Sequence, residues 1–274
     1  MKYFISFYFK GLFLFFTDSN FRTFTRLFLN NIVKKRFTEY VFKVNGYKIL
    51  VADITSFMWQ YHEIFVNKFY AFTTTSSQPV IYDCGANIGT SVLFFSEKFP
   101  KAKIIAYEAS PYIFGILMQN IKENNVSNVK AFQNAVWIKN ETLEFSEEGA
   151  DGGSIYSLTN SKKVKVQALD FLEILNREEK IDMLKMDIEG AENELIPHIA
   201  SAMHKIDNMF IEYHSFNNSE QKLDEILSLL SQHKFRYYIR HVNNRKSPFI
   251  DIADDKEMDM QLNIFAYKQL NKKV

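Results

Sequence analysis

Five ionisable side chains stand at or near the ends of short apolar runs, where they could do chemistry. Asp83, Glu108 and Asp187 each end such a run, and Glu212 and His214 alternate with apolar residues in a fourth. Short apolar runs bounded by polar residues are typical of buried strands. Because ligands bind beyond the carboxyl ends of strands in an open α/β sheet, we expect these side chains to share one site.

The strongest local signal is the segment Val80-Ile-Tyr-Asp-Cys-Gly-Ala-Asn-Ile-Gly-Thr. Asp83 ends a predicted strand, and Gly85 and Gly89 permit a tight turn into a helix. We expect Gly85 to let a ligand approach the backbone, and Gly89 to let the helix pack closely on the strand. Asn87 occupies a glycine position of the dinucleotide-binding fingerprint, and no Gly-Lys-[Ser/Thr] follows, so neither that fingerprint nor a P-loop matches.

The charge pattern of this segment points to a zwitterionic ligand. An acid at the strand end would repel a pyrophosphate but suits an ammonium group, while amides at a helix start favour a carboxylate. S-adenosylmethionine carries both groups, so we predict that Asp83, Gly85, Asn87 and Gly89 bind it. Glu108 follows Asp83 by 25 residues, near the spacing of an acid that accepts ribose hydroxyls. The alternative is an ordinary strand–helix turn with Asp83 as its cap.

Two further segments complete the predicted site. Asn134, Ala135 and Val136 follow the third strand, where Asn134 could hydrogen-bond an adenine edge and Val136 could cover its face, although core packing explains the apolar members equally well. Lys185 lies in an apolar strand, which is costly ground for a charge unless it is paired. We therefore expect it to pair with the acids or steady a developing alkoxide.

His214 is the natural base near neutral pH, with Asp187 and Glu212 orienting it. As a lone histidine it could equally be structural. The same three residues could alternatively bind a hard divalent cation such as Mg²⁺.

The elements that must position these residues are strands alternating with helices from residue 79 to residue 267. This pattern predicts an α/β fold, a Rossmann-like doubly wound, mostly parallel sheet. The runs 235–240 and 263–267 predict a late antiparallel pair. We divide the chain into an N-terminal basic, Phe-rich helical extension (1–45), a strand and helix lead-in (46–78) and a cofactor-binding domain (79–270).

Composition narrows the possible partners and surroundings. The net charge of +1 gives no argument for nucleic acid binding. One cysteine excludes an internal disulfide, and no apolar run reaches the roughly 18–20 residues that span a bilayer, so we expect a cytoplasmic protein. Residues 1–36 hold seven Lys and Arg against one Asp, a net charge of +6, which leaves −5 for the remainder. With nine Phe in the first 30 residues, this segment either contacts a membrane surface peripherally or packs as helices on the catalytic domain.

Several motifs together resemble the FkbM-type methyltransferase family. DCGANIGT, YEASP, NAV, LKMDIEGAE and FIEYH occur in the family's order over residues 79–267. The resemblance implies a Rossmann-like fold and methyl transfer from S-adenosylmethionine, commonly onto a hydroxyl of a sugar or natural product, so the partner would be a small-molecule or glycan acceptor. Two alternatives are a non-catalytic Rossmann-like binding or scaffold module and an NAD-dependent oxidoreductase, which Asn87 and Asp83 disfavour.

Overall fold

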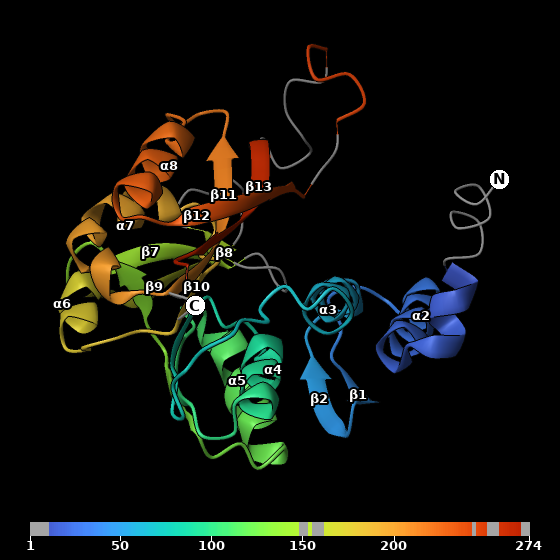
Figure 1. Cartoon of the computed structure of the whole chain (residues 1–274). Helices are drawn as coiled ribbons and strands as arrows, with labels where there is room; N and C mark the ends of the chain where they lie inside the picture. The colour runs from blue at the N-terminus through green and yellow to red at the C-terminus, as the bar shows by residue number, and fades with distance from the viewer. Residues whose placement is uncertain (1–10, 148–152, 155–161, 243–244, 251–257, 270–274) are drawn as a thin grey trace.

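The computed structural model describes residues 11–147, 153–154, 162–242, 245–250 and 258–269 (Figure 1). Its centre is a seven-stranded sheet in the order β12-β13-β11-β10-β3-β4-β5. Strand β13 pairs antiparallel with β11 on one side and β12 on the other, and the remaining pairs of this sheet are parallel. The predicted Rossmann-like α/β fold and its late antiparallel strand are therefore confirmed. The strands are β3 (Val80–Cys84), β4 (Lys103–Tyr107), β5 (Val129–Phe132), β10 (Met183–Met186), β11 (Asn208–Phe216), β12 (Arg236–His241) and β13 (Met258–Tyr267).

Helices cover both faces of this sheet (Figure 1). Successive side chains of a strand point to opposite faces. Tyr82 and Cys84 accordingly pack in one hydrophobic cluster with α6, α7 and α8, whereas Ile81 packs in a second cluster with α3, α4 and α5. The helix that begins at Glu192 is short, because a 3-10 helix replaces it from Ala200. The helices are α4 (Thr90–Lys98), α5 (Pro111–Glu123), α6 (Phe171–Asn176), α7 (Glu192–His198), the 3-10 helix η2 (Ala200–Lys205) and α8 (Leu223–Gln232).

A second sheet, which the sequence did not indicate, follows β5. It has four strands in the order β6-β9-β7-β8. Strand β6 pairs in parallel with the end of β9, and β7 pairs antiparallel with both β9 and β8. This sheet stands beside the carboxyl edge of β4 and β5 and supplies one wall of the site described below. Its strands are β6 (Ala135–Trp137), β7 (Glu141–Glu147), β8 (Gly153–Ser154) and β9 (Lys162–Asp170).

The N-terminal part of the chain contains a hairpin as well as helices. Residues 11–17 are helical, and α2 (Ser19–Val33) follows. Strands β1 (Tyr40–Val44) and β2 (Tyr47–Val51) then pair antiparallel. The predicted division between residues 45 and 46 falls inside the turn of this hairpin, so the two N-terminal segments are not separate there. The helix of the lead-in, α3 (Ile54–Tyr61), continues as a π-helix, η1 (His62–Val66), and then ends.

The lead-in shares its core with the large sheet. Phe57 and Tyr61 of α3 are fully buried in the cluster that contains Ile81 of β3. Asn120 of α5 joins the two parts through its side-chain amide, which accepts from the Leu50 N–H at 2.7 Å and donates to the Leu50 carbonyl at 2.9 Å. Among the described residues, no helix combines the length and hydropathy needed to cross a bilayer.

Candidate active site

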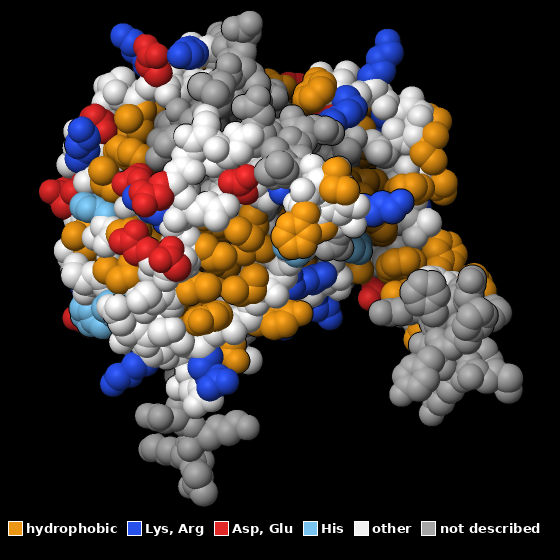
Figure 2. Space-filling view, turned by 90° about the horizontal axis from the view of Figure 1, so that it is seen from above, with side chains coloured by type: hydrophobic (Ala, Val, Ile, Leu, Met, Phe, Trp, Pro, Cys, Tyr) orange, Lys and Arg blue, Asp and Glu red, His pale blue; other side chains and the backbone are white. Residues whose placement is uncertain are grey.

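A cavity lies at the carboxyl ends of β3, β4 and β10, where the topology rule places ligands. The space between its lining residues, counted together with the part open to solvent, is about 670 Å³. Seen from above, hydrophobic side chains gather over this face with acidic side chains beside them (Figure 2). The lining comes from the turns after β3 and β10, the end of β4 and the second sheet. It includes six of the predicted cofactor residues, namely Gly85, Asn87, Glu108, Asn134, Ala135 and Val136.

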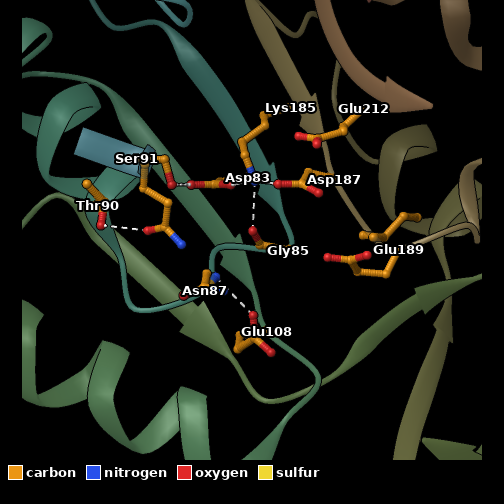
Figure 3. A network of polar contacts seen from close by, with 12 residues as sticks. Asp83, Gly85, Asn87, Thr90, Ser91, Glu108, Lys185, Asp187, Glu189 and Glu212 are labelled. Atoms are coloured by element: carbon orange, nitrogen blue, oxygen red, sulfur yellow. Dashed lines mark hydrogen bonds and ion pairs between the residues drawn. The ribbon is translucent and has the colours of Figure 1, made fainter. Parts of the chain in front are cut away.

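Glu108 is the buried acceptor of this cavity. Its two carboxylate oxygens accept the backbone N–H groups of Asn87 (Figure 3) and of Ser110, each at 2.9 Å. A carboxylate has about four lone-pair sites, so both oxygens keep capacity for further donors. Burial raises the pKa of Glu108 to about 7, although the two backbone hydrogen bonds oppose this. The carboxyl group is thus held in place by two backbone hydrogen bonds in the lining of the cavity.

The turn after β3 needs glycine for a different reason from the expected one. Gly85 has φ +77°, and a Cβ built there would lie 1.7 Å from the Asp187 carbonyl oxygen. The sequence predicted that a ligand would lie close to the Gly85 backbone. In the structure the backbone that follows β10 lies there. Gly89, with φ +91°, faces Leu117 of α5, whose Cδ1 would lie 2.7 Å from an added Cβ. Its tight packing is against a helix, whereas the sequence predicted a strand.

Asp83 does not face the cavity, which corrects the prediction that it meets an ammonium group. Its side chain is 0% exposed, and Lys185, at 3%, places its Nζ 3.2 Å from Asp83 Oδ1. Ser91 Oγ donates to Asp83 Oδ2 at 2.5 Å. Asp83 is not among the residues that line the cavity, whereas its partner Lys185 contacts two that are, Gly85 and Asp187. Asp83 therefore pairs with the ammonium group of Lys185, where the sequence predicted the ammonium group of a ligand.

Lys185 pairs with the acids, as predicted. Besides Asp83, its Nζ lies 3.6 Å from Asp187 Oδ2 and donates to the Gly85 carbonyl at 2.7 Å (Figure 3). Burial alone would lower the pKa of Lys185, but the charges of Asp83 and Asp187 outweigh it and raise the pKa above its ordinary value. The ammonium group therefore stays charged and ties the turn after β3 to the turn after β10.

The turn after β10 brings two carboxylates to the cavity, Asp187 and Glu189. Glu189 has φ +55° and Gly190 has φ +100°, so the backbone folds back on itself here. Glu192, at the start of α7, holds this turn because its carboxylate accepts the N–H groups of Ile188 at 2.6 Å and of Gly190 at 2.7 Å. The acid-rich motif is thus partly structural, with Glu192 stabilising the turn that presents the other two acids.

His214 lies on β11 behind this turn and is 1% exposed. Its Nδ1 is 3.5 Å from Glu192 Oε1, and its Nε2 is 3.5 Å from Glu189 Oε2 and 4.0 Å from Glu212 Oε1. Burial lowers the pKa of His214, but the carboxylates of Glu192 and Glu189 raise it well above its ordinary value. We expect a charged imidazolium at neutral pH, which cannot accept a proton. Its surroundings therefore disfavour the predicted role as base.

The proposed metal ligands do come together. Asp187, Glu212 and His214 each present one potential ligand atom, and these atoms lie within 4.8 Å of one another. Carboxylate oxygens suit a hard cation, but an imidazole must be neutral to ligate. Because neighbouring carboxylates hold the proton on His214, a metal ion would have to compete with that proton. The grouping is consistent with either a cation or the observed ion pairs.

Two residues of the lead-in face this acidic cluster and were missed by sequence reasoning. Burial raises the pKa of Glu63, in the π-helix η1, to about 7, with the Asp187 charge adding to this and Arg240 opposing it. Tyr70 is buried, with its ring centroid 5.9 Å from Lys185 Nζ. The one available signal was an acid inside an otherwise apolar helical stretch, and π-helical turns are frequent at functional sites.

The second sheet closes the other side of the cavity. Val136 and Trp137 of β6 and Phe145 of β7 are buried apolar lining residues. Asn134 also lines the cavity, but its Nδ2 donates to the Gln167 carbonyl at 3.2 Å. Its amide is therefore oriented by β9, with the carbonyl end left to contact a ligand. An apolar wall with one polar edge suits a flat heteroaromatic ring.

Comparisons with known proteins agree with this site. The family described as the Methyltransferase FkbM domain matches residues 83–237, a range that contains every lining residue named above. Methyltransferase sdnD of Sordaria araneosa is 30% identical over 178 residues, covering 50% of this chain and 66% of that protein. Hexuronic acid methyltransferase AglP of Haloferax volcanii is 25% identical over 166 residues, covering 60% and 66%. 2-O-methyltransferase NoeI of Sinorhizobium fredii is 26% identical over 167 residues, covering 54% and 66%.

Solved structures align more loosely. The FkbM methyltransferase of Methylobacillus flagellatus KT gives a TM-score of 0.47 at 16% identity, covering 70% of this chain and 45% of that one. Each of the three curated relatives is matched over just under two thirds of its own length. Since the family match alone spans more than half of the chain and includes the whole cavity, this protein belongs to the FkbM methyltransferase family.

Proposed function

We propose that this protein transfers a methyl group from S-adenosylmethionine to a hydroxyl group of a sugar or small molecule. The observation that carries the proposal is the placement of the acidic groups in the cavity. The buried acceptor Glu108 follows β4, and the carboxylates of Asp187 and Glu189 follow β10. Two donors on a ribose suit the first and an ammonium group suits the second. When bound, the cofactor supplies a methyl group already activated on a sulfonium.

Each part of the cavity has a task in binding. Glu108 would accept the ribose hydroxyls, and Val136 and Trp137 would pack against the adenine while Asn134 contacts its edge. Asp187 would take the ammonium group, because its carboxylate lines the cavity and Lys185 Nζ, at 3.6 Å, holds it in place. Asp83 would act indirectly, by fixing Lys185. Alignment of this kind is the larger part of catalysis when the reacting group is already activated.

Glu189 is the base that we propose for the acceptor hydroxyl. It lines the cavity. The proton on the acceptor oxygen becomes strongly acidic as that oxygen gains a methyl group, so a carboxylate suffices to take it. His214 would then be a positioning residue, whose imidazolium, 3.5 Å from the Glu189 carboxylate, fixes that side chain. Glu212 would help to hold His214 in turn. The acceptor class follows from the relatives whose names specify a sugar acid or a 2-O position.

Calorimetry with S-adenosylhomocysteine tests the binding half of the proposal. We expect the wild type to bind and Glu108→Gln to bind at least about tenfold more weakly, because the amide offers only one acceptor oxygen to two hydroxyls. Glu123→Gln, on the exposed end of α5 in an ion pair with Lys48, is the matched control and should bind like the wild type. Absence of heat with the wild type would contradict the proposal and favour a scaffold, and heat with NAD instead would favour the oxidoreductase alternative.

Turnover tests the catalytic half. The protein is incubated with S-adenosylmethionine and a panel of hexuronic acids and neutral glycosides, and methylated products are located by mass spectrometry. We expect Glu189→Gln to lower kcat about 100-fold, within the usual contribution of a positioned proton acceptor, while affinity for S-adenosylhomocysteine stays within about threefold. An unchanged kcat in Glu189→Gln would exclude this residue as the base. Methylation of a nitrogen or carbon atom would exclude the hydroxyl as acceptor.

A further inference from the structure

Helix α2 has two apolar faces, and only one of them packs on the rest of the protein. Leu27 is 2% exposed, and the ring of Phe24 lies 4.5 Å from the His62 ring and 6.1 Å from the Trp59 ring. Helix α2 is thereby seated on α3 and η1. The expectation that the N-terminal helices pack on the rest of the chain is correct for this face.

The second face is exposed along the last turns of α2. Its four side chains are spaced at i, i+1, i+4 and i+5, which places them on one side of a helix, and their exposed fractions run from 47% to 79%. The helical residues 11–17 expose four more large apolar side chains. We call these eight residues the N-terminal apolar surface, which consists of Leu12, Phe13, Phe15, Phe16, Phe28, Leu29, Ile32 and Val33.

This surface lies at the periphery of the molecule. Helix α2 is on the far side of α3 from the seven-stranded sheet (Figure 1), and hydrophobic side chains reach the outside on the same flank in the view from above (Figure 2). Contiguous exposed apolar side chains are rare on monomeric proteins unless they mark an interaction site. The described part of the chain leaves this surface exposed, so it can meet a partner that fits a protruding helical surface.

Charge indicates what that occupant is. Residues 11–36 contain five basic side chains and one acidic side chain, Asp18. The Asp18 carboxylate is already engaged, since it accepts the N–H groups of Asn20 and Phe21 at the start of α2. A second copy of this chain would bring two positively charged surfaces together, which is unfavourable. An anionic surface is attracted instead. The basic residues are Arg22, Arg26, Lys34 and Lys35, together with Arg36, whose guanidinium is already paired with the buried carboxylate of Asp53 at 2.9 Å.

We propose that the N-terminal apolar surface docks the protein in the plane of an anionic lipid bilayer. Phe, Leu and Ile side chains would enter the boundary between headgroups and acyl chains, and the basic side chains would lie at the level of the anionic headgroups. Because none of the described helices can cross a bilayer, this contact is peripheral. It would hold the protein beside acceptors that are themselves attached to a membrane.

Vesicle flotation of the full chain tests this proposal. The probes are vesicles of phosphatidylcholine alone and vesicles of phosphatidylcholine with phosphatidylglycerol. We expect the wild type to float with the anionic vesicles and at least about tenfold less with the neutral ones. The triple variant Phe28→Gln, Leu29→Gln, Ile32→Gln should lose flotation. The matched control is Tyr237→Gln with Tyr238→Gln, which changes exposed aromatic residues of β12 and should float like the wild type.

Two measurements keep the outcomes distinct. A thermal melt and S-adenosylhomocysteine titration of each variant check folding, and neither should change because all substituted side chains are exposed. Equal flotation of the triple variant and the wild type, or no flotation of either, would overturn the proposal. Self-association of the wild type without vesicles, abolished in the triple variant, would also overturn it and assign the surface to contact between copies.

Discussion

Replacing Lys185 by Met tests the buried charge network from which the site is built. The substitution keeps a flexible chain of similar length but removes the ammonium group that lies 3.2 Å from Asp83 Oδ1 and 2.7 Å from the Gly85 carbonyl. Asp83 Oδ1 has no other hydrogen-bond partner among the described residues, so the variant leaves a fully buried carboxylate half unpaired. Removing one partner of a buried ion pair costs about 3–5 kcal/mol.

Urea unfolding followed by circular dichroism gives the free energy of unfolding for this comparison. The matched control is Lys103→Met, which removes an ammonium group 2.6 Å from Glu178 Oε1 at a site where the lysine is 53% exposed. Exposed pairs contribute about 0–1 kcal/mol, so this variant should stay within that range.

The double variant Lys185→Met, Asp83→Asn separates pairing from packing. It should cost less than the two single changes together, with an interaction energy of about 1–3 kcal/mol. The reasoning would be refuted if Lys185→Met cost no more than Lys103→Met, or if the Lys185 and Asp83 changes were additive.

Three further predictions concern the turn, the acceptor and the core. Gly85→Ala should cost about 2–6 kcal/mol in urea unfolding, from backbone strain and collision with a carbonyl. Gly46→Ala, at φ +82° with nothing within 4 Å, should cost only the strain of about 1–2 kcal/mol. Because the pKa of Glu108 is raised to about 7, its protonated form contributes stability that is complete below about pH 4.5 and is lost as the pH rises through 7. In unfolding measured against pH, the wild type should lose about 3 kcal/mol over this range relative to Glu108→Gln. A difference between the two proteins that does not change with pH would contradict the raised pKa. Asn120→Ala leaves buried backbone groups unpaired and should lower the free energy of unfolding by about 2–4 kcal/mol. Asn124→Ala removes similar hydrogen bonds at an exposed position and should lower it by under about 1 kcal/mol. Equal losses in the two variants would show that burial is not the cause.

Local signals account for the parts of the fold that were predicted. The strand ending at Asp83 and the helix after Gly89 are recognisable because apolar runs, glycine and helical periodicity all occur within 20 residues. Pairing across long separations leaves no such signal. Strand β6 pairs with the end of β9, more than 30 residues later, and the short run at 135–137 is equally compatible with a loop. The second sheet was missed for this reason.

The site residues were located better than their roles. Sequence patterns placed Asp83, Lys185 and His214 at one edge of the sheet, but not which charge faces which. Asp83 pairs with Lys185 at 3.2 Å, and the carboxylates of Glu192 and Glu189, each 3.5 Å from His214, raise the pKa of its imidazole. A histidine or an acid is assigned as a base or a ligand contact only when its neighbours are known. Those neighbours are set by tertiary packing.

The core shared by the lead-in and the sheet bears on where a shorter version of this protein could begin. The family match starts at Asp83, yet Phe57, Tyr61 and the backbone of Leu50 are packed or hydrogen-bonded against the elements that follow. A fragment cut at the first matched residue would lose most of β3 and also α3, which covers part of the sheet face on which α4 and α5 pack. Fragments for expression should therefore start no later than the hairpin at Tyr40. Shorter fragments would expose apolar side chains that are buried in the full chain, and we expect them to precipitate.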